Sequence, residues 1–205
     1  MSPPATVTLA FTGASGMPYG MRLLEQLLAG GTRVYLIYSQ VAQVVARQEM
    51  DLALPSRSGE AEAFFAAKFK AGEGQLKVFG REEWFAPVAS GSSVADAMII
   101  CPCTMGTLAA VAAGLARNLI ERAADVSLKE GRRLVLVPRE TPFSAIHLEN
   151  MLRLARAGAV ILPANPGFYH HPQSVQELVD FVVARILDQI GVPNALVGRW
   201  GAEED

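Results

Sequence analysis

The chain has 205 residues, of which 51% are hydrophobic and 19% charged, and its formal net charge is −2. This charge balance argues against a nucleic-acid binder held by positive charge. No apolar run reaches the ~20 residues of a membrane span. The amino terminus lacks the apolar core of a signal peptide. The two cysteines stand in a Cys-x-Cys pair rather than a disulfide framework, so we expect the reducing cytoplasm.

The first half of the chain alternates strands and helices. A strand is predicted over Thr6–Thr12, then a turn over Gly13–Gly16 and a helix from Pro18, which suits a first helical turn, to about Ala29. A strand at Arg33–Tyr38 leads through Ser39 to a helix at Val41–Met50. Residues 51–96 are less regular, with a helix expected at Glu60–Phe69 and a strand at Leu76–Phe79.

Three short apolar runs in the second half end in polar loops that contain proline. They are Ala97–Cys101 before Pro102–Thr107, Leu134–Val137 before Pro138–Thr141, and Val160–Leu162 before Pro163–His170. Helical stretches follow the first two loops, and a helix over Ser174–Ile190 closes the fold. Continuously apolar strands are typical of a parallel sheet covered on both faces by helices. We predict an α/β, three-layer, Rossmann-like fold with a mainly parallel sheet, formed by one domain over 1–205 with a tail at 193–205.

The loop after the first strand is a candidate anion site. Gly13-Ala14-Ser15-Gly16 places backbone N–H groups and a hydroxyl at a helix start, which suits a phosphate. The spacing is not the dinucleotide G-x-G-x-x-G, and Tyr38-Ser39 stands where a ribose-binding acid would follow the second strand. A mononucleotide phosphate is therefore favoured over NAD, with an ordinary tight turn as the alternative.

The loop from Cys101 to Thr107 offers hydroxyls and N–H groups at another helix start. A metal is not expected there, because a second cysteine pair is missing and His147 lies apart from His170 and His171. Both cysteines are then small packing residues. The first loop does not fit a serine hydrolase either, since its second glycine comes one place too early for G-x-S-x-G.

Several charged residues are open to more than one interpretation. Arg122 and Lys129 fall on one face of a predicted helix, where a solvated face with local pairs is the simpler explanation. Arg139-Glu140 is different, because it stands at the mouth of a buried strand. Glu49, near the end of an apolar helix, is either functional or merely solvated.

Six motifs together resemble those of the flavin prenyltransferases, the UbiX-type proteins. They are GASG, CPCTMGTLAAVA, NLIERAADVSLKE, LVLVPRETP, IHLENM and GAVILPANPGFYH, and the resemblance runs from Thr6 to about Val192. It implies a flavoprotein fold and transfer of a dimethylallyl group from dimethylallyl monophosphate to N5 and C6 of reduced FMN. It also implies a metal-free homododecamer with active sites at subunit contacts. The product, prenylated FMN, would serve UbiD-type decarboxylases of ubiquinone or aromatic acid metabolism.

The resemblance also implies roles for individual residues. FMN contacts are expected at Gly13, Ala14, Ser15, Ser39, Thr104, Met105, Gly106, Thr107 and Arg139. The prenyl phosphate is expected at Arg122, Lys129, Tyr169 and Arg185. Ser15, Glu49 and Glu140 are the expected catalytic residues. Thr104 departs from the serine that the family often has, but keeps the hydroxyl. Trp84 and Trp200 are candidates for an apolar prenyl pocket, with core packing as the alternative.

The residues support this interpretation on one point of their own. Metal-dependent prenyl transfer needs Asp-rich clusters for Mg²⁺, and the sequence has none, so a leaving phosphate would need Arg, Lys and hydroxyl groups. Two rivals remain open. One is an FMN-dependent decarboxylase of a cysteine-ended substrate, which generally carries an asparagine-bearing motif in place of CPCTMGTLA. The other is a non-catalytic flavin carrier, which would not need the four phosphate-binding residues.

Overall fold

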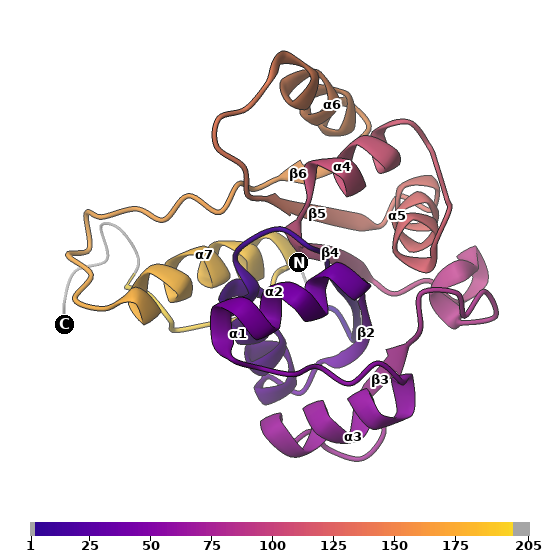
Figure 1. The fold of residues 1–205 in the computed structure, drawn as a ribbon, viewed down its shortest axis with the longest axis horizontal. Coiled ribbons are helices and arrows are strands. Elements are labelled where there is room, and N and C mark those ends of the chain that lie inside the picture. The colour runs from indigo at the N-terminus through magenta and orange to yellow at the C-terminus, as the bar shows by residue number, and fades with distance from the viewer. Residues whose placement is uncertain (1–2, 199–205) are drawn as a thin grey trace.

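The computed structural model describes residues 3–198 of the chain. At its centre lies one sheet of six strands in the order β3-β2-β1-β4-β5-β6 (Figure 1). The strands are β1 (Thr6–Phe11), β2 (Arg33–Tyr38), β3 (Leu76–Phe79), β4 (Ala97–Cys103), β5 (Arg133–Pro138) and β6 (Val160–Ile161). Every neighbouring pair is parallel, which confirms the sheet type expected from continuously apolar strands.

Helices cover both faces of the sheet, because successive strand residues point into two separate cores. In β1, Leu9 and Phe11 enter one core and Ala10 enters the other. The first core lies under α1 (Met17–Ala29), α2 (Gln40–Met50), α3 (Ser58–Phe69) and α7 (Val175–Ile190), and the second under α4 (Met105–Ala112), α5 (Leu119–Lys129) and α6 (Ala145–Arg156). Figure 1 shows α4 and α6 above β5, α5 to its right, and the other helices below it. The three predicted layers are confirmed.

The loop predicted at Pro102–Thr107 is wrong, because β4 continues to Cys103 and α4 begins at Met105. Pro102 lies at an irregularity in the register between β4 and β5, a place where a sheet tolerates a residue without an N–H. Its carbonyl oxygen accepts hydrogen bonds from the Thr12 backbone N–H (3.2 Å) and hydroxyl (2.7 Å). The end of β1 therefore holds the end of β4 in place.

The helical stretch expected after β4 is divided into α4 and α5. Gly114 adopts a left-handed conformation (φ 70°) just after α4, and Asn118 begins α5 by accepting a hydrogen bond from the Glu121 N–H at 3.0 Å. Because of this break, the amino end of α5 returns to the carboxyl edge of the sheet, where it meets the loops after β1 and β2.

The strand order opens a crevice between β1 and β4. The chain proceeds from β1 outward through β2 and β3, then returns to place β4 on the other side of β1. Loops leaving the carboxyl ends of β1 and β4 therefore diverge, and such a switch point is where open α/β sheets bind ligands. Two short 3-10 turns, η1 (Pro87–Ala89) and η2 (Gly91–Ser93), join β3 to β4. No helix within residues 3–198 is long and apolar enough to cross a membrane.

Candidate active site

Three helices begin at one cavity beside the switch point. The cavity measures about 260 Å³ and is lined by Thr12, Gly13, Ser39, Gln40, Val41, Arg81, Thr104, Thr107, Asn118 and Ile120. Ser39, Thr104 and Asn118 are the N-cap residues of α2, α4 and α5, and each side chain accepts a backbone hydrogen bond from its own helix. We call this space the three-helix cavity.

The three-helix cavity favours a negatively charged group. Each helix start leaves backbone N–H groups without helical partners and carries about +0.5 of an elementary charge. Arg81 is the only charged residue that lines the cavity in the part of the chain that the structure describes. Converging N–H groups, hydroxyls of Ser39, Thr104 and Thr107, and one cation form a suitable environment for a phosphate.

Close packing fixes the loop that leaves β1. A Cβ atom on Gly13 would lie 2.4 Å from Cγ1 of Val41, so only glycine fits between this loop and α2. On the other side, the Thr104 N–H donates to the Thr12 hydroxyl at 2.8 Å. The loops after β1 and β4 are thereby held together, with Gly13, Ser39, Thr104 and Thr107 around one space, as expected of residues predicted to bind one ligand. Met105 and Gly106 form the first turn of α4.

The amino end of α1 is occupied by an acidic side chain. The Glu49 carboxylate accepts hydrogen bonds from the N–H groups of Gly16 (3.1 and 3.0 Å) and Met17 (2.9 Å). Gly16 is the N-cap of α1 and has no side chain to cap it, so Glu49 does so from α2. The sequence predicted a phosphate at this helix end, but these N–H groups already bind the Glu49 carboxylate and are not available to it. Glu49 is likewise not a merely solvated helix end.

The loops after β1 and β5 also meet. Arg139 donates from Nε to the backbone oxygen of Ser15 at 3.4 Å, so two residues predicted to bind FMN lie together, and neither lines the three-helix cavity. Glu140 accepts a hydrogen bond from the Thr141 N–H at 3.1 Å within its own turn. Ser15 and Arg139 are therefore in direct contact, and Glu140 lies near them because it follows Arg139 in the chain.

The predicted phosphate ligands on α5 lie apart from this group. Arg122 pairs with Asp125 at 2.8 Å and donates to the Ala89 backbone oxygen at 3.1 Å. Lys129 pairs with Glu130 in the last turn. Since α5 rises about 1.5 Å per residue, Lys129 lies roughly 15 Å along the helix from Leu119. One chain therefore cannot bring Lys129 to its own three-helix cavity.

Tyr169 and Arg185 line a second cavity of about 410 Å³ with Phe181, Asp188 and Asn194 among other residues, and none of its lining residues belongs to the three-helix cavity. Arg185 pairs with Asp188 at 2.9 Å. Tyr169 is 53% exposed on the segment between β6 and α7, which projects away from the sheet (Figure 1). Trp84 is 45% exposed beside Phe85, and Trp200 lies outside the described residues.

Sequence reasoning missed Arg81, Gln40 and Asn118 in the wall of the three-helix cavity. Asn118 carried a usable signal, because an asparagine three residues before Glu121 is typical of a helix start. Arg81 carried no local signal, since its position depends on how the β3 loop folds onto α5.

The Cys-x-Cys pair is buried and unpaired. Burial raises the pKa of the Cys103 thiol to about 12, and burial with the neighbouring Cys103 raises the pKa of Cys101. Both thiols therefore remain protonated packing groups. Within residues 3–198, no cluster of three His, Cys, Asp or Glu side chains is arranged to hold a metal ion.

Comparison with known proteins bears on this arrangement. The family model described as Flavoprotein matches residues 1–187. The flavin prenyltransferase UbiX of Pseudomonas aeruginosa is 58% identical over 203 residues, covering 99% of this chain and 97% of that protein. UbiX of Halalkalibacterium halodurans is 46% identical over 97% of this chain and 94% of its own length.

Solved structures of similar proteins share the fold of this chain. The crystal structure of AnUbiX in complex with FMN and dimethylallyl pyrophosphate is 40% identical, with a TM-score of 0.86 over 97% of this chain and 98% of that one. A dodecameric FMN-dependent UbiX-like decarboxylase from Escherichia coli O157:H7 is 40% identical, with a TM-score of 0.84 over 96% of this chain and 100% of that one. With the family model, the sequence identity and the overall fold in agreement, this chain belongs to the UbiX family of flavin prenyltransferases.

Proposed function

We propose that this chain transfers the dimethylallyl group of dimethylallyl monophosphate to N5 and C6 of reduced FMN without a metal ion. The observation that carries the proposal is the three-helix cavity, a preformed phosphate site in a chain 58% identical to a flavin prenyltransferase. The prenylated FMN would then pass to a UbiD-type decarboxylase. Two unpaired thiols fit the reducing cytoplasm as its location.

FMN would enter with its phosphate in the three-helix cavity. The hydroxyls of Ser39, Thr104 and Thr107 would bind the phosphate oxygens, and Gly13 would allow the ligand to approach the backbone closely. From there the flavin ring would extend along the β1 loop toward Ala14, Ser15 and Arg139. The contact between Arg139 and Ser15 supports this direction, since it joins the β5 loop to the β1 loop. Met105 and Gly106 would support the ring from α4.

The prenyl phosphate would be held by Arg122, Lys129, Tyr169 and Arg185. Loss of phosphate builds negative charge on its oxygens, and fixed cations and a phenol stabilise that charge as it forms. Glu49 and Glu140 would move the protons that N5 and C6 lose and the proton that the prenyl double bond gains on ring closure, with Ser15 beside N5. The electrophile is the allyl cation that forms when the phosphate leaves. The main contributions of the protein would therefore be to position the two substrates and to stabilise the developing charges.

The proposed site needs more than one subunit. Within one chain, Arg122 and Lys129 pair with Asp125 and Glu130 at α5, and Tyr169 and Arg185 line a separate cavity that includes no residue of the β1 loop. We therefore propose a closed homo-oligomer, by analogy with the dodecameric relative a homododecamer, in which neighbours complete each site. Exposed apolar side chains such as Phe85, Ile146 and Phe168 would be covered by such contacts.

The direct test is anaerobic incubation of the protein with reduced FMN and dimethylallyl monophosphate, followed by mass analysis of the released flavin. We expect the mass of one added isoprene unit, and the same yield with EDTA present. Dimethylallyl pyrophosphate, the compound bound in the similar AnUbiX structure, is the comparison donor. Unmodified flavin with both donors would refute the proposal. Carbon dioxide release from a peptide ending in cysteine would indicate the rival decarboxylase.

A further inference from the structure

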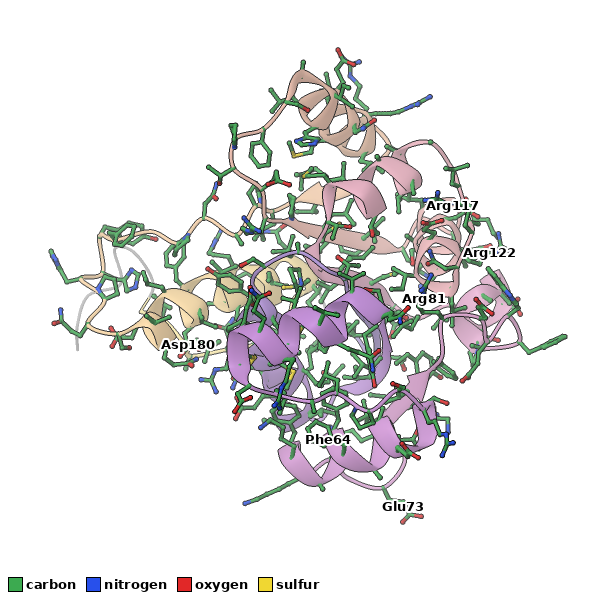
Figure 2. The ribbon with its side chains drawn as sticks, viewed as in Figure 1. Phe64, Glu73, Arg81, Arg117, Arg122 and Asp180 are labelled. Atoms are coloured by element: carbon green, nitrogen blue, oxygen red, sulfur yellow. The ribbon has the colours of Figure 1, made fainter. Side chains whose placement is uncertain are left out.

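The guanidinium of Arg81 is a cation at the proposed phosphate site, and it has no hydrogen-bond or ion-pair partner within residues 3–198. It follows β3 and lines both the three-helix cavity and an adjoining cavity of about 290 Å³. No carboxylate of the described chain forms an ion pair with its guanidinium. Arg117 and Arg122, which lie near it around α5 in Figure 2, are each paired with an acid.

The backbone that carries Arg81 is fixed against α5 at two points. The Leu119 N–H donates to the Arg81 carbonyl oxygen at 2.8 Å, and Nε of Arg122 donates to the Ala89 oxygen at 3.1 Å. Glu83, two residues further along, is occupied by the Gly80 N–H at 2.8 Å and the Ser58 hydroxyl at 2.9 Å. The loop is therefore anchored at the cavity with its cation available and its acid engaged elsewhere.

The charges at the cavity indicate what Arg81 could bind. Three helix starts together supply about +1.5 elementary charges, whereas a phosphate monoester carries about −1.5 to −2 near pH 7. The helix starts alone therefore leave up to about half an elementary negative charge on the phosphate uncompensated, and Arg81 is the charged residue in the cavity wall that can compensate it. We infer that Arg81 binds the phosphate of FMN and makes the site select FMN over riboflavin; this rests on the proposed function, which places that phosphate in the three-helix cavity.

The test compares two flavins that differ only in the phosphate. Dissociation constants of oxidised FMN and riboflavin are measured by flavin fluorescence for the wild type, Arg81→Gln and Arg81→Lys. A lost hydrogen bond between charged groups corresponds to about 10–100-fold in affinity. We expect Arg81→Gln to weaken FMN binding by that factor and leave riboflavin binding unchanged. Arg81→Lys should recover part of the loss, and the salt dependence of FMN binding should be smaller in Arg81→Gln.

Arg33→Gln is the matched control, because it removes the same charge at the amino end of β2, the opposite edge of the sheet. It should keep the wild-type preference for FMN. If Arg81→Gln also keeps that preference, Arg81 does not bind the phosphate and the inference fails alone. If the wild type binds riboflavin as tightly as FMN, the placement of the phosphate in the proposed function fails, and the inference fails with it. Equal weakening of both flavins would mean that Arg81 only supports the loop.

Discussion

Glu49 holds two backbone N–H groups of α1 immediately after Ser15, so its carboxylate combines a structural contact with a position beside the proposed ring site. Glu49→Gln keeps an oxygen acceptor for these groups but removes the charge. If Glu49 moves a proton, prenylation should slow by about 10²–10⁴-fold, while FMN binding is retained. Single-turnover formation of the prenylated flavin measures this, with the FMN dissociation constant measured in parallel.

A second variant separates the two roles of Glu49. Glu49→Ala removes both charge and acceptor, so it should also lower the unfolding temperature, since loss of a helix cap costs about 1 kcal/mol. If Glu49→Gln turns over at the wild-type rate, Glu49 is a cap and not a catalytic residue.

The thiols of Cys101 and Cys103 should be unreactive in the folded protein. Their raised pKa values, about 12 for Cys103, leave almost no thiolate at pH 8, and both side chains are buried. A thiol reagent such as Ellman's should therefore label neither cysteine in native protein and both after denaturation. Rapid labelling of the native protein would show that the Cys-x-Cys pair is open to solvent or chemically active.

At the scale of the element, the start of α5 depends on a buried acid. Glu121 is 4% exposed and accepts from the backbone N–H (2.8 Å), Nε (3.2 Å) and Nη2 (3.0 Å) of Arg117. Burial by itself would raise the pKa of Glu121, but the bonds from Arg117 outweigh it and lower the pKa below 4.5. The hydrogen bonds between Glu121 and Arg117 should therefore stabilise the fold above pH 4.5, and their contribution should disappear as the pH falls through the lowered pKa of Glu121.

Glu121→Gln should lower the free energy of unfolding by about 1.5–3 kcal/mol at pH 7, the range for hydrogen bonds to a charged group. The difference from wild type should shrink as the pH falls well below the ordinary value of 4.5. Urea unfolding at several pH values measures this. A penalty that stays constant down to acid pH would mean that packing, not the charge of Glu121, is what matters.

The packing of α1 on the sheet depends on Gly20. A Cβ atom there would lie 2.5 Å from the carbonyl oxygen of Cys101 and 2.9 Å from the Phe11 ring. Gly20→Ala should therefore destabilise the protein by about 1–3 kcal/mol, although alanine is the better helix former. Gly59→Ala on α3 is the control, because its Cβ would meet no atom within 4 Å and should be neutral or slightly stabilising. Unfolding temperatures of both variants decide the question.

The positions of the strands were predictable from sequence, but complete burial did not secure their bounds, since the fully buried β4 extends beyond its predicted end. The bounds of β2 and β3 agree with the predicted runs, and β1 differs by one residue, because apolar and aromatic side chains dominate these runs, although Thr8 lies within β1 and Lys77 within β3. Pro102 misled the argument, since it was taken as the start of a loop although the strand passes through it. The break between α4 and α5 was missed because the helical pattern continues on both sides of Gly114.

The candidate site was predictable where a loop follows a buried strand. Gly13, Ser39 and Thr104 were located this way and line one cavity. Arg81 could not be found, because its carbonyl bond to Leu119 joins two loops far apart in the chain, and an exposed arginine in an irregular stretch resembles any solvated residue. The contact between Glu49 and the first N–H groups of α1 could not be predicted either, because it joins residues far apart in the chain and no local sequence pattern indicates it.

At the scale of the whole molecule, the division of the proposed site between subunits predicts complementation. Lys129→Ala chains keep an intact Glu49 side, and Glu49→Gln chains keep an intact Lys129 side. If the two sides belong to different subunits, mixed oligomers made by co-expression should regain part of the prenylation activity that each variant lacks alone. Glu49→Gln mixed with Arg139→Ala, two changes on one side, is the control and should regain none. Equal activity in both mixtures would place all these residues within one subunit.

The path of α5 has a consequence for how such a protein behaves on dilution. This helix begins at the three-helix cavity with Leu119, directly after its N-cap Asn118, and ends with Lys129 about 15 Å away from Leu119. The groups proposed to hold the flavin phosphate come from one chain, whereas those proposed for the prenyl phosphate would come from neighbouring chains. Subunits that separate at low concentration would thus keep their flavin and lose turnover, so that specific activity becomes a measure of association while flavin content does not.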